Sequence, residues 1–332
     1  MKVVITGGAG FLGSRLCEEV LKRGELTGRS GRPEAVDEVV VFDVLPAVEV
    51  SDDRITPIAG DVSDPIQALA LIDAATDTVF HLGAMVSGGA EADFDVGYQS
   101  NLNGTRCVLE ACRRLARNPR VIFTSSVAAY GGELPEIVDD STPTRPETSY
   151  GVQKVIGELL INDYTRKGYL DGRSARLPAI VVRPGRPNTA ASSWCSGIIR
   201  EPLSGVDTVC PVTPETRLPC LSPRGVMEAL ITLHEAPPEA FGAHRTVLLP
   251  GLTVTAAQMV ESAERHQDGR AFGAVKWKQD SLIQNMVDGW PKGTDAAQAR
   301  SLGIAADGGI DEIVEGFVTD YLDSQIALAK SG

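Results

Sequence analysis

The chain has 332 residues, of which 43% are hydrophobic and 23% are charged. This length predicts a main domain with a smaller second lobe, and the composition excludes a mainly disordered or collagen-like chain. Acidic residues outnumber basic ones by 44 to 31, and the resulting net charge of −13 would repel nucleic acid and anionic membrane surfaces. We therefore expect neither a nucleic-acid partner nor a membrane partner.

The distribution of apolar residues, cysteines and histidines indicates a cytoplasmic protein without a metal. Apolar stretches such as 178–182 are too short to span a bilayer, and the first residues, MKVVI, resemble a buried strand rather than a signal peptide. The six cysteines form no Cys-x-x-Cys pair, which favours reduced thiols. The four histidines lack the spacing of zinc ligands, so no metal site is expected.

Short β-branched runs alternate with amphipathic stretches over the first 183 residues. This alternation predicts an α/β fold, a doubly wound parallel (Rossmann) sheet with helices on both faces. A helix is expected at 11–23, ending before Gly24, and the polar stretch 25–37 is interpreted as a surface insertion without a function. The predicted strands are 3–6, 39–43, 55–59, 78–82, 121–125 and 179–183.

After Arg183 the alternation gives way to sequence interrupted by proline and glycine. Helical patterns remain at 222–235, 255–266 and 311–322. The sequence therefore predicts two domains, a first one over 1–185 and a smaller C-terminal α/β lobe over 186–332.

A glycine-rich segment, TGGAGFLG at 6–13, follows the first strand and opens the first helix. Gly7 permits the tight turn, Gly10 lets a pyrophosphate approach the backbone, and Gly13 allows close packing of helix on strand. The helix start, with Phe11 and Leu12, adds free N–H groups and a positive dipole end. A turn that binds nothing is the alternative, but the flanking strand and helix favour a dinucleotide site.

The second strand ends in Asp43, whose carboxylate would accept hydrogen bonds from the adenosine ribose and repel a 2′-phosphate. The expected cofactor is therefore NAD rather than NADP. Asp43 lies 30 residues after Gly13, farther than the usual spacing of about 20 residues, and the insertion accounts for the excess. Asp61, with Val62, ends the third strand and is a second candidate contact, to the adenine amino group.

Polar side chains gather near the expected carboxyl edge of the sheet. Tyr150 and Lys154, four residues apart, share one face of a predicted helix. The strand at 121–125 ends in hydroxyls and is followed by Ser126, at the edge where open α/β sheets bind ligands. This edge is the expected functional site.

The order of these motifs resembles the extended short-chain dehydrogenases/reductases, in the branch of NAD-dependent epimerases and dehydratases. The resemblance covers about the first 185 residues; the tail at 299–303 is less specific. Its motifs are TGGAGFLG at 6–13, Asp61 with Val62, HLGA at 81–84, NLNGT at 101–105, SSVAAYG at 125–131, Tyr150 with Lys154, and RPG at 183–185.

The resemblance implies roles for individual residues. Tyr150 would be the acid/base, Lys154 a ribose ligand and Ser126 the hydroxyl that orients the reacting oxygen, with Tyr150 also beside the cofactor. Leu82, Gly83 and Ala84 would line the cofactor, and Pro184 would pack by the nicotinamide. Asn101 matches the family's helix-stabilising asparagine, for which a purely structural role fits at least as well as a catalytic one, and His81 is interpreted as a packed side chain.

The reaction follows less directly from the motifs. Dehydratases of this family place Asp-Glu where this chain has Val127 and Ala128, so dehydration is not expected. A nucleotide-sugar epimerase with tightly held NAD remains an alternative, and so does another small 2- or 3-hydroxy acid dehydrogenase. A sensor without activity is disfavoured because Tyr150 and Lys154 are intact. A homodimer that pairs 101–115 with 150–164 is implied by the resemblance.

The segment 183–203 combines arginines with small hydroxyls, which would suit a polyhydroxylated acid, since arginine binds carboxylates bidentately. It resembles the dehydrogenases that oxidise the C2 hydroxyl of D-erythronate to the 2-oxo acid. For Arg186 and Arg200, ordinary surface cations are an equal alternative. The candidate substrate-binding residues are Ser87, Ser126, Tyr150, Arg186, Asn188, Ser192, Ser193 and Arg200.

Overall fold

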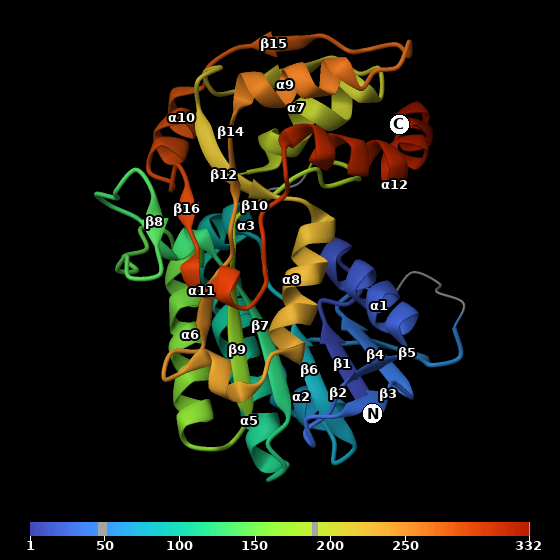
Figure 1. Cartoon of the computed structure of the whole chain (residues 1–332), viewed down its shortest axis with the longest axis vertical. Coiled ribbons are helices and arrows are strands. Elements are labelled where there is room, and N and C mark those ends of the chain that lie inside the picture. The colour runs from blue at the N-terminus through green and yellow to red at the C-terminus, as the bar shows by residue number, and fades with distance from the viewer. Residues whose placement is uncertain (46–51, 188–191, 332) are drawn as a thin grey trace. The chain divides into compact units, whose positions relative to one another are not determined.

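The computed structural model of the chain describes residues 1–45, 52–187 and 192–331 (Figure 1). These residues form two compact units, and each unit is assembled from separate stretches of chain. Unit 1 comprises Met1–Ala129, Thr148–Arg176 and Met227–Val247, and unit 2 comprises Tyr130–Glu147, Leu177–Val226 and Leu248–Gly332. The division therefore differs from a single cut after residue 185, because the chain changes unit five times.

Unit 1 is built around a seven-stranded sheet in the order β13-β9-β7-β6-β1-β4-β5. The pairs from β7 to β5 are parallel, which confirms the predicted doubly wound fold. The five predicted strands between 3 and 125 are confirmed to within two residues at each end. The strands are β1 (Lys2–Thr6), β4 (Glu38–Asp43), β5 (Ile55–Ala59), β6 (Thr76–His81), β7 (Arg120–Ser126), β9 (Asp171–Leu177) and β13 (Thr246–Leu248).

The sixth predicted core strand, at 179–183, is wrong. Only β10 (Ala179–Ile180) forms there, and it pairs with β12 (Arg217–Leu221) in a separate sheet of unit 2. The core position belongs to β9, whose arginines interrupt the apolar pattern. Both arginines form ion pairs, the buried Arg173 with Asp171 and the half-buried Arg176 with Glu158, so polar residues occupy a core strand.

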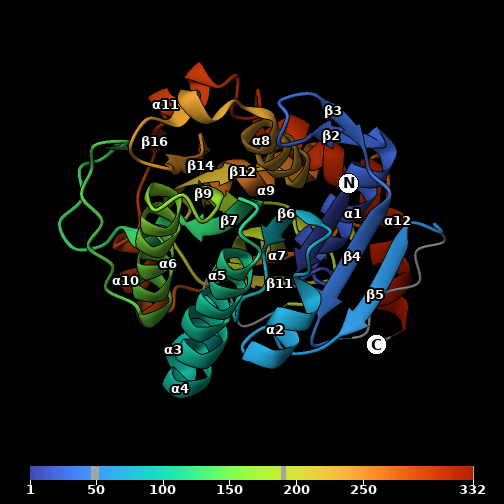
Figure 2. The ribbon, with the colours of Figure 1, turned by 90° about the horizontal axis from the view of Figure 1, so that it is seen from below.

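Helices cover both faces of this sheet (Figure 2). The helices α2 (Pro65–Leu71), α5 (Gly104–Arg114) and α6 (Ser149–Arg166) lie on one face, and their apolar residues pack with alternate residues of β1, β4, β6 and β7. The helix α1 (Phe11–Arg23) and the part of α8 (Pro223–Glu235) from Met227 on lie on the other face. The helix predicted at 11–23 is confirmed, and Gly24 ends it with φ 71°.

The stretch 25–37 is a hairpin rather than an irregular insertion. Its strands β2 (Glu25–Thr27) and β3 (Pro33–Ala35) are antiparallel, and Leu26 and Val36 are buried. Thr27 donates to the Glu235 carboxylate from its backbone N–H and its hydroxyl, which ties the hairpin to the end of α8. The prediction missed the hairpin because only two of its side chains enter the core.

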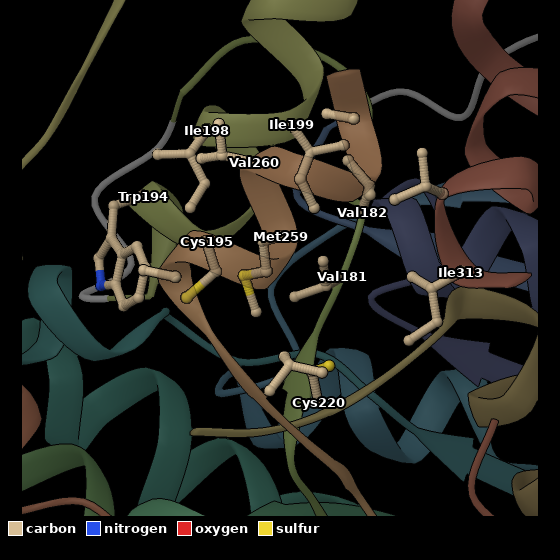
Figure 3. Close-up of a cluster of buried hydrophobic side chains, with 14 of the residues drawn as sticks. Val181, Val182, Trp194, Cys195, Ile198, Ile199, Cys220, Met259, Val260 and Ile313 are labelled. Carbon is tan, nitrogen blue, oxygen red and sulfur yellow. The ribbon is translucent and has the colours of Figure 1, made fainter. Parts of the chain in front are cut away.

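Unit 2 combines short sheets with helices that share one apolar core (Figure 3). Cys195, Ile198 and Ile199 of α7 pack with Met259 and Val260 of α9. The helices predicted at 222–235, 255–266 and 311–322 are confirmed, the last being longer. The strands are β8 (Val138–Asp139) with β16 (Thr294–Asp295), β11 (Thr208–Cys210) with β15 (Val275–Trp277), and β14 (Leu252–Thr255) beside β12; the helices are α7 (Ser193–Leu203), α9 (Ala256–Arg265), α10 (Ser281–Asp288), α11 (Ala297–Ser301) and α12 (Ile310–Lys330).

The cysteines and other potential ligands give no sign of a metal or a disulfide within the described residues. All six cysteines are buried and free, and burial raises the pKa of each thiol. In the same residues, no group of three or more His, Cys, Asp or Glu side chains is arranged to hold a metal ion. No described helix has the length and apolar character that crossing a membrane requires.

Candidate active site

The turn after β1 crosses the end of β6 with backbone against backbone. A Cβ atom on Gly7, whose φ is +69°, would lie 2.6 Å from the backbone nitrogen of Gly83. On Gly13 it would lie 2.1 Å from the Gly7 carbonyl oxygen. Thr6 fixes the crossing, because its hydroxyl oxygen accepts from the Gly83 N–H at 3.3 Å. These glycines thus allow the close packing that the sequence predicted.

The amino end of α1 faces this turn without a side-chain cap. Gly10 is the N-cap and has no side chain to accept from the first-turn N–H groups, and no acidic residue lies in that turn of α1. Phe11 and Leu12, the first two residues of the helix, are half-buried. A helix start of this kind binds anions, because its N–H groups and its dipole both favour negative charge.

Asp43 ends β4 beside the glycine turn. Its carboxylate accepts from the Ala9 N–H at 3.1 Å and from the Leu45 N–H at 3.2 Å. These two backbone contacts link the ends of β1 and β4 and orient the carboxylate. Asp61 is held in a similar way, since one of its oxygens accepts from both the N–H and the hydroxyl of Ser63 at 2.8 Å.

A cavity of about 500 Å³ lies among these elements of unit 1. Its volume is within the range of small-molecule and cofactor sites. Phe11, Leu12, Gly13, Asn101, Tyr150 and Lys154 are outside its lining. The predicted cofactor residues that line it are Gly7, Gly10, Asp43, Asp61, Val62, Leu82, Gly83 and Ala84.

Several lining residues were missed by the sequence analysis. Met85 and Ser63 directly follow predicted residues, so their positions next to the motifs were an available signal, whereas Val96, Gln99 and Ser100 carry no motif. Gln99 donates to the Ser63 hydroxyl at 3.1 Å and so joins two parts of the wall. The missed lining residues are Phe42, Val44, Leu45, Gly60, Ser63, Met85, Val96, Gln99 and Ser100.

Asn101 supports the cavity from behind. It lies in a π-helical turn, Tyr98–Asn103, and is buried. Its carbonyl oxygen accepts from the Met85 N–H at 2.7 Å, and its amide donates to the Met85 carbonyl at 3.1 Å and to Gln153 at 2.7 Å. These contacts join the loop after β6 to α6, which fits the structural role left open above.

The residues of the predicted catalytic trio occupy adjoining elements of unit 1. Thr148 caps α6 by accepting from the Gly151 N–H at 3.1 Å, which fixes the helix start around Tyr150. Lys154 is buried, with its ammonium 5.5 Å from the centroid of the Tyr150 ring and donating to the Thr124 carbonyl at 2.8 Å. Ser126 ends β7, and its hydroxyl oxygen accepts from the Ala128 N–H at 3.1 Å.

Burial sets the protonation of two side chains here. It lowers the pKa of Lys154 to about 8, with the Glu158 carboxylate acting in the opposite direction. It also lowers the pKa of His81 to about 3, and the Lys154 charge adds to that effect. His81 is therefore neutral and packed, as predicted, between the Thr6 and Thr105 hydroxyls at 2.7 and 3.0 Å. An ammonium this close to Tyr150 would favour its phenolate.

The remaining candidates for substrate binding lie in unit 2, apart from Ser87, the first residue of α3 (Ser87–Ala92) in unit 1. Pro184 is half-buried and Arg186 is exposed, and Asn188 lies outside the described residues. Ser192 and Ser193, both half-buried, stand at the start of α7. Nearby, the Gln325 amide brackets Gly185, accepting from its N–H at 2.7 Å and donating to its carbonyl at 3.3 Å.

Arg200 is not a surface cation. The residue is 2% exposed, and its guanidinium donates to the Arg183 carbonyl and to the Glu201 carboxylate, both at 2.6 Å. The alternative of an ordinary exposed arginine is therefore wrong for Arg200, because these contacts hold it inside unit 2, whereas Arg186 is exposed.

Comparison with known proteins places this geometry in a family. Residues 3–239 match the model of the NAD dependent epimerase/dehydratase family. The chain belongs to this family. Its membership confirms the predicted NAD cofactor.

Two curated relatives match almost the whole chain. A D-erythronate dehydrogenase of Cupriavidus necator is 49% identical over 320 residues, covering 96% of this chain and 98% of its own. One of Haemophilus influenzae is 41% identical over 319 residues, covering 96% and 99%. With the family, these relatives confirm the predicted class of enzyme, an NAD-dependent dehydrogenase.

A solved structure supports the fold over the same length. The structure described as the nucleoside-diphosphate-sugar epimerase from Agrobacterium tumefaciens has a TM-score of 0.91 and 37% identity, with 98% of this chain and 96% of that chain covered. The doubly wound fold is thus shared over nearly the whole chain.

Replacement of Gly13 by alanine tests the glycine turn. The new Cβ atom would overlap the Gly7 carbonyl, so the start of α1 must shift, and we expect the affinity for NAD to fall at least about tenfold, the equivalent of about 1.4 kcal/mol. Titration calorimetry with NAD measures this. Gly309→Ala is the matched control, since its Cβ would meet nothing within 4 Å. An unchanged affinity in Gly13→Ala would contradict the role of this turn.

Replacement of Asp43 by asparagine tests cofactor selection. The amide keeps the size of the side chain but removes the charge that repels a 2′-phosphate, so the preference for NAD over NADP should narrow about tenfold or more. Dissociation constants for both cofactors give the ratio, and Asp288→Asn, in α10 of unit 2, controls for the loss of one negative charge. If the ratio of the two dissociation constants equals that of the unmodified chain, Asp43 does not select between NAD and NADP.

Proposed function

We propose that this chain oxidises a small sugar acid, D-erythronate, at its C2 hydroxyl to give 2-dehydro-D-erythronate (2-oxo-tetronate), with NAD as the hydride acceptor. The observation that supports this most strongly is the identity of 49% and 41%, over nearly full length, to two D-erythronate dehydrogenases. The neighbouring positions of Tyr150, Lys154 and the end of β7 agree with it.

We assign NAD mainly to residues of unit 1, with Pro184 of unit 2 added from the family resemblance. The start of α1, with Gly10, Phe11, Leu12 and Gly13, would bind the pyrophosphate, and Asp43 the adenosine ribose. Asp61 and Val62 would contact the adenine. Leu82, Gly83 and Ala84 would line the rest of the cofactor, Lys154 would bind the nicotinamide ribose, and Pro184 would pack by the nicotinamide. Asn101 would act by holding Met85 in the wall.

The chain's own part in the reaction is to position the hydroxyl and to remove its proton. Bound NAD supplies the acceptor for the hydride that leaves C2. Ser126 orients the substrate oxygen, and Tyr150 removes the hydroxyl proton as general base. A tyrosine with a reference pKa near 10 must be stabilised as the phenolate by about 4 kcal/mol to act near pH 7, and the Lys154 ammonium contributes to this.

Unit 2 would supply the specificity for an acid. Arg186 is exposed, whereas Arg200 is buried and donates to Glu201 and to the Arg183 carbonyl. We assign the carboxylate to Arg186 and the hydroxyl groups to Ser192, Ser193 and Asn188, and we keep Ser87 of unit 1 as a further candidate. Arg200 then acts indirectly, by holding the start of this segment on α7.

The proposal also includes an oligomeric state and a location in the cell, both implied by the family resemblance. The chain would be a cytoplasmic homodimer that pairs α5 with α6 across the interface, for which the exposed Leu159 on α6 is suited. Unit 1 would bind NAD and carry out the chemistry, and unit 2 would recognise the acid.

The first experiment measures NADH absorbance after the chain is mixed with NAD and a panel of D-erythronate, L-threonate and UDP-sugars. We expect NADH with D-erythronate and none with the UDP-sugars. Tyr150→Phe should lower turnover at least about a hundredfold and leave NAD affinity intact, because one oxygen is lost. Epimerised UDP-sugar without net NADH would replace this proposal by a nucleotide-sugar epimerase, which the Agrobacterium structure makes the second candidate.

The assignment of the carboxylate predicts different defects at the two arginines. Arg186→Ala should raise KM for D-erythronate at least about tenfold with kcat within about twofold, as expected for lost ground-state binding. Arg200→Ala should instead lower the melting temperature, because the Glu201 carboxylate would be left without its cation. Steady-state kinetics and thermal melts separate the two. An unaltered KM in Arg186→Ala would overturn this assignment.

A further inference from the structure

Helix α6 carries a buried carboxylate to which the mechanism above gives no part. Glu158 lies one turn after Lys154 and two turns after Tyr150, and it is 3% exposed. Residues spaced by four share one face of a helix, so these three side chains face the sheet together. A buried charge is costly unless it is paired and hydrogen-bonded, so its partners indicate what it does.

The partners of Glu158 are a serine of β7 and an arginine of β9. One carboxylate oxygen accepts from the Ser125 hydroxyl at 2.5 Å and from Nε of Arg176 at 2.8 Å. The other accepts from Nη2 of Arg176 at 2.6 Å. The guanidinium therefore binds the carboxylate in a bidentate way, through Nε and Nη2, and this geometry fixes the orientation of the carboxylate.

Lys154 and Glu158 hold consecutive residues of β7. The Lys154 ammonium donates to the carbonyl of Thr124 at 2.8 Å, and Glu158 binds the side chain of Ser125. The next residue is Ser126, the hydroxyl assigned to the substrate oxygen. Rotation or sliding of α6 against β7 would break both contacts, so they fix the register between the helix and the strand end.

The helix is also close enough to the strand for these short contacts. Gly157 lies between Lys154 and Glu158 on α6, and a Cβ atom there would come 2.6 Å from Cζ of Phe123 on β7. The ring of Phe123 in turn lies 4.8 Å from the Lys154 ammonium. The close approach at Gly157 brings both polar side chains within reach of the β7 backbone and hydroxyl.

The titratable and charged groups around Lys154 come from three elements. On α6 they are Tyr150 and Glu158; from β6, His81 is neutral because burial lowers its pKa to about 3; and from β9, Arg176 is bound to the far side of Glu158. Glu158 is the carboxylate among these described groups, and it opposes the effect of burial on Lys154. Without it, the Lys154 ammonium would lose the carboxylate that opposes the effect of its burial.

We propose that Glu158 is a positioning residue for the dehydrogenation. It fixes α6 on the end of β7 so that Tyr150 and Lys154 face Ser126, and its negative charge keeps Lys154 in the ammonium form. This inference rests on the proposed function, because its value for catalysis requires the roles given to Tyr150, Lys154 and Ser126.

The charge is tested with Glu158→Gln, which keeps the size of the side chain and an oxygen that accepts from Ser125. Loss of a neighbouring carboxylate lowers a lysine pKa, so the ammonium disappears at a lower pH. The alkaline limb of the pH profile of kcat should move down by about 1 pH unit or more. Glu235→Gln, which removes a carboxylate bound by the Thr27 hydroxyl beside the start of β7, is the matched control and should keep the limb in place.

The contact with β7 is tested separately with Ser125→Ala. This change leaves both charges and removes the hydroxyl that links Glu158 to the strand. We expect kcat to fall at least about fivefold with the pH limb unmoved and KM for D-erythronate within about twofold, because the register of α6 loosens while the charges remain. A wild-type kcat in Ser125→Ala would overturn the proposal.

Two further measurements keep the test decisive. If Glu158→Gln fails to fold because Arg176 loses this carboxylate, Glu158→Gln combined with Arg176→Gln removes both charges and should move the limb in the same direction. Lysine 13Cε NMR titration, with Lys154 assigned from Lys154→Arg, reports the ammonium without turnover. An unshifted Lys154 titration in a folded variant overturns the inference, whereas a shifted titration in a chain that makes no NADH overturns only the proposed function.

Discussion

The turn after β1 has no space for side chains where it crosses the end of β6, and the cavity depends on that close approach. Gly7 and Gly13 each lack the atom that would collide with neighbouring backbone. Because the turn packs directly against the backbone at the end of β6, the N–H of Ala9 donates to the carboxylate of Asp43 at the end of β4. The absence of a side chain at Gly7 and Gly13 thus determines how the ends of β1, β4 and β6, the start of α1 and the Asp43 carboxylate are arranged.

A second close contact joins α6 and β7, which carry the residues proposed for the chemistry. The two hydroxyls proposed to act on the substrate come from different elements, Tyr150 from the helix and Ser126 from the strand. The distance between them is therefore decided by how the two elements pack. Gly157 permits the approach, while Lys154 and Glu158 supply the polar contacts that hold it. Packing and catalysis depend on the same face of one helix.

Sequence reasoning predicted the parts of the molecule in which local pattern and burial agree. β1, β4 and β7 are apolar on both sides because helices cover both faces of the sheet, so their strands were evident. β9 was missed because it contains two arginines in ion pairs. Arg173 pairs with Asp171 of the same strand, and Arg176 pairs with Glu158 of α6. No hydrophobic periodicity reveals such pairing. β13 was missed because three residues carry too little pattern.

The candidate site was predictable to a similar extent. Motif residues such as Gly7, Asp43 and Gly83 were assigned to the cofactor from the sequence and line one cavity in the structure. Gln99 and Ser100 line it too, but only because a π-helical turn brings them there, which depends on folding rather than on spacing. Arg200 was ambiguous for a related reason: its burial against Glu201 is decided by packing within unit 2.

The interrupted path of the chain also governs how the protein is made. Unit 1 lacks the second half of α8 and strand β13 until residue 247 has been synthesised, although its other strands are complete by residue 177. At about 5–20 residues per second, the ribosome needs several seconds to supply the missing 70 residues. During that interval β9 is an unpaired edge strand of the sheet, and Phe80 lacks the ring of His234 that stacks on it in the folded protein. The nascent chain is therefore exposed to aggregation after β9 has been made and before β13 completes the sheet.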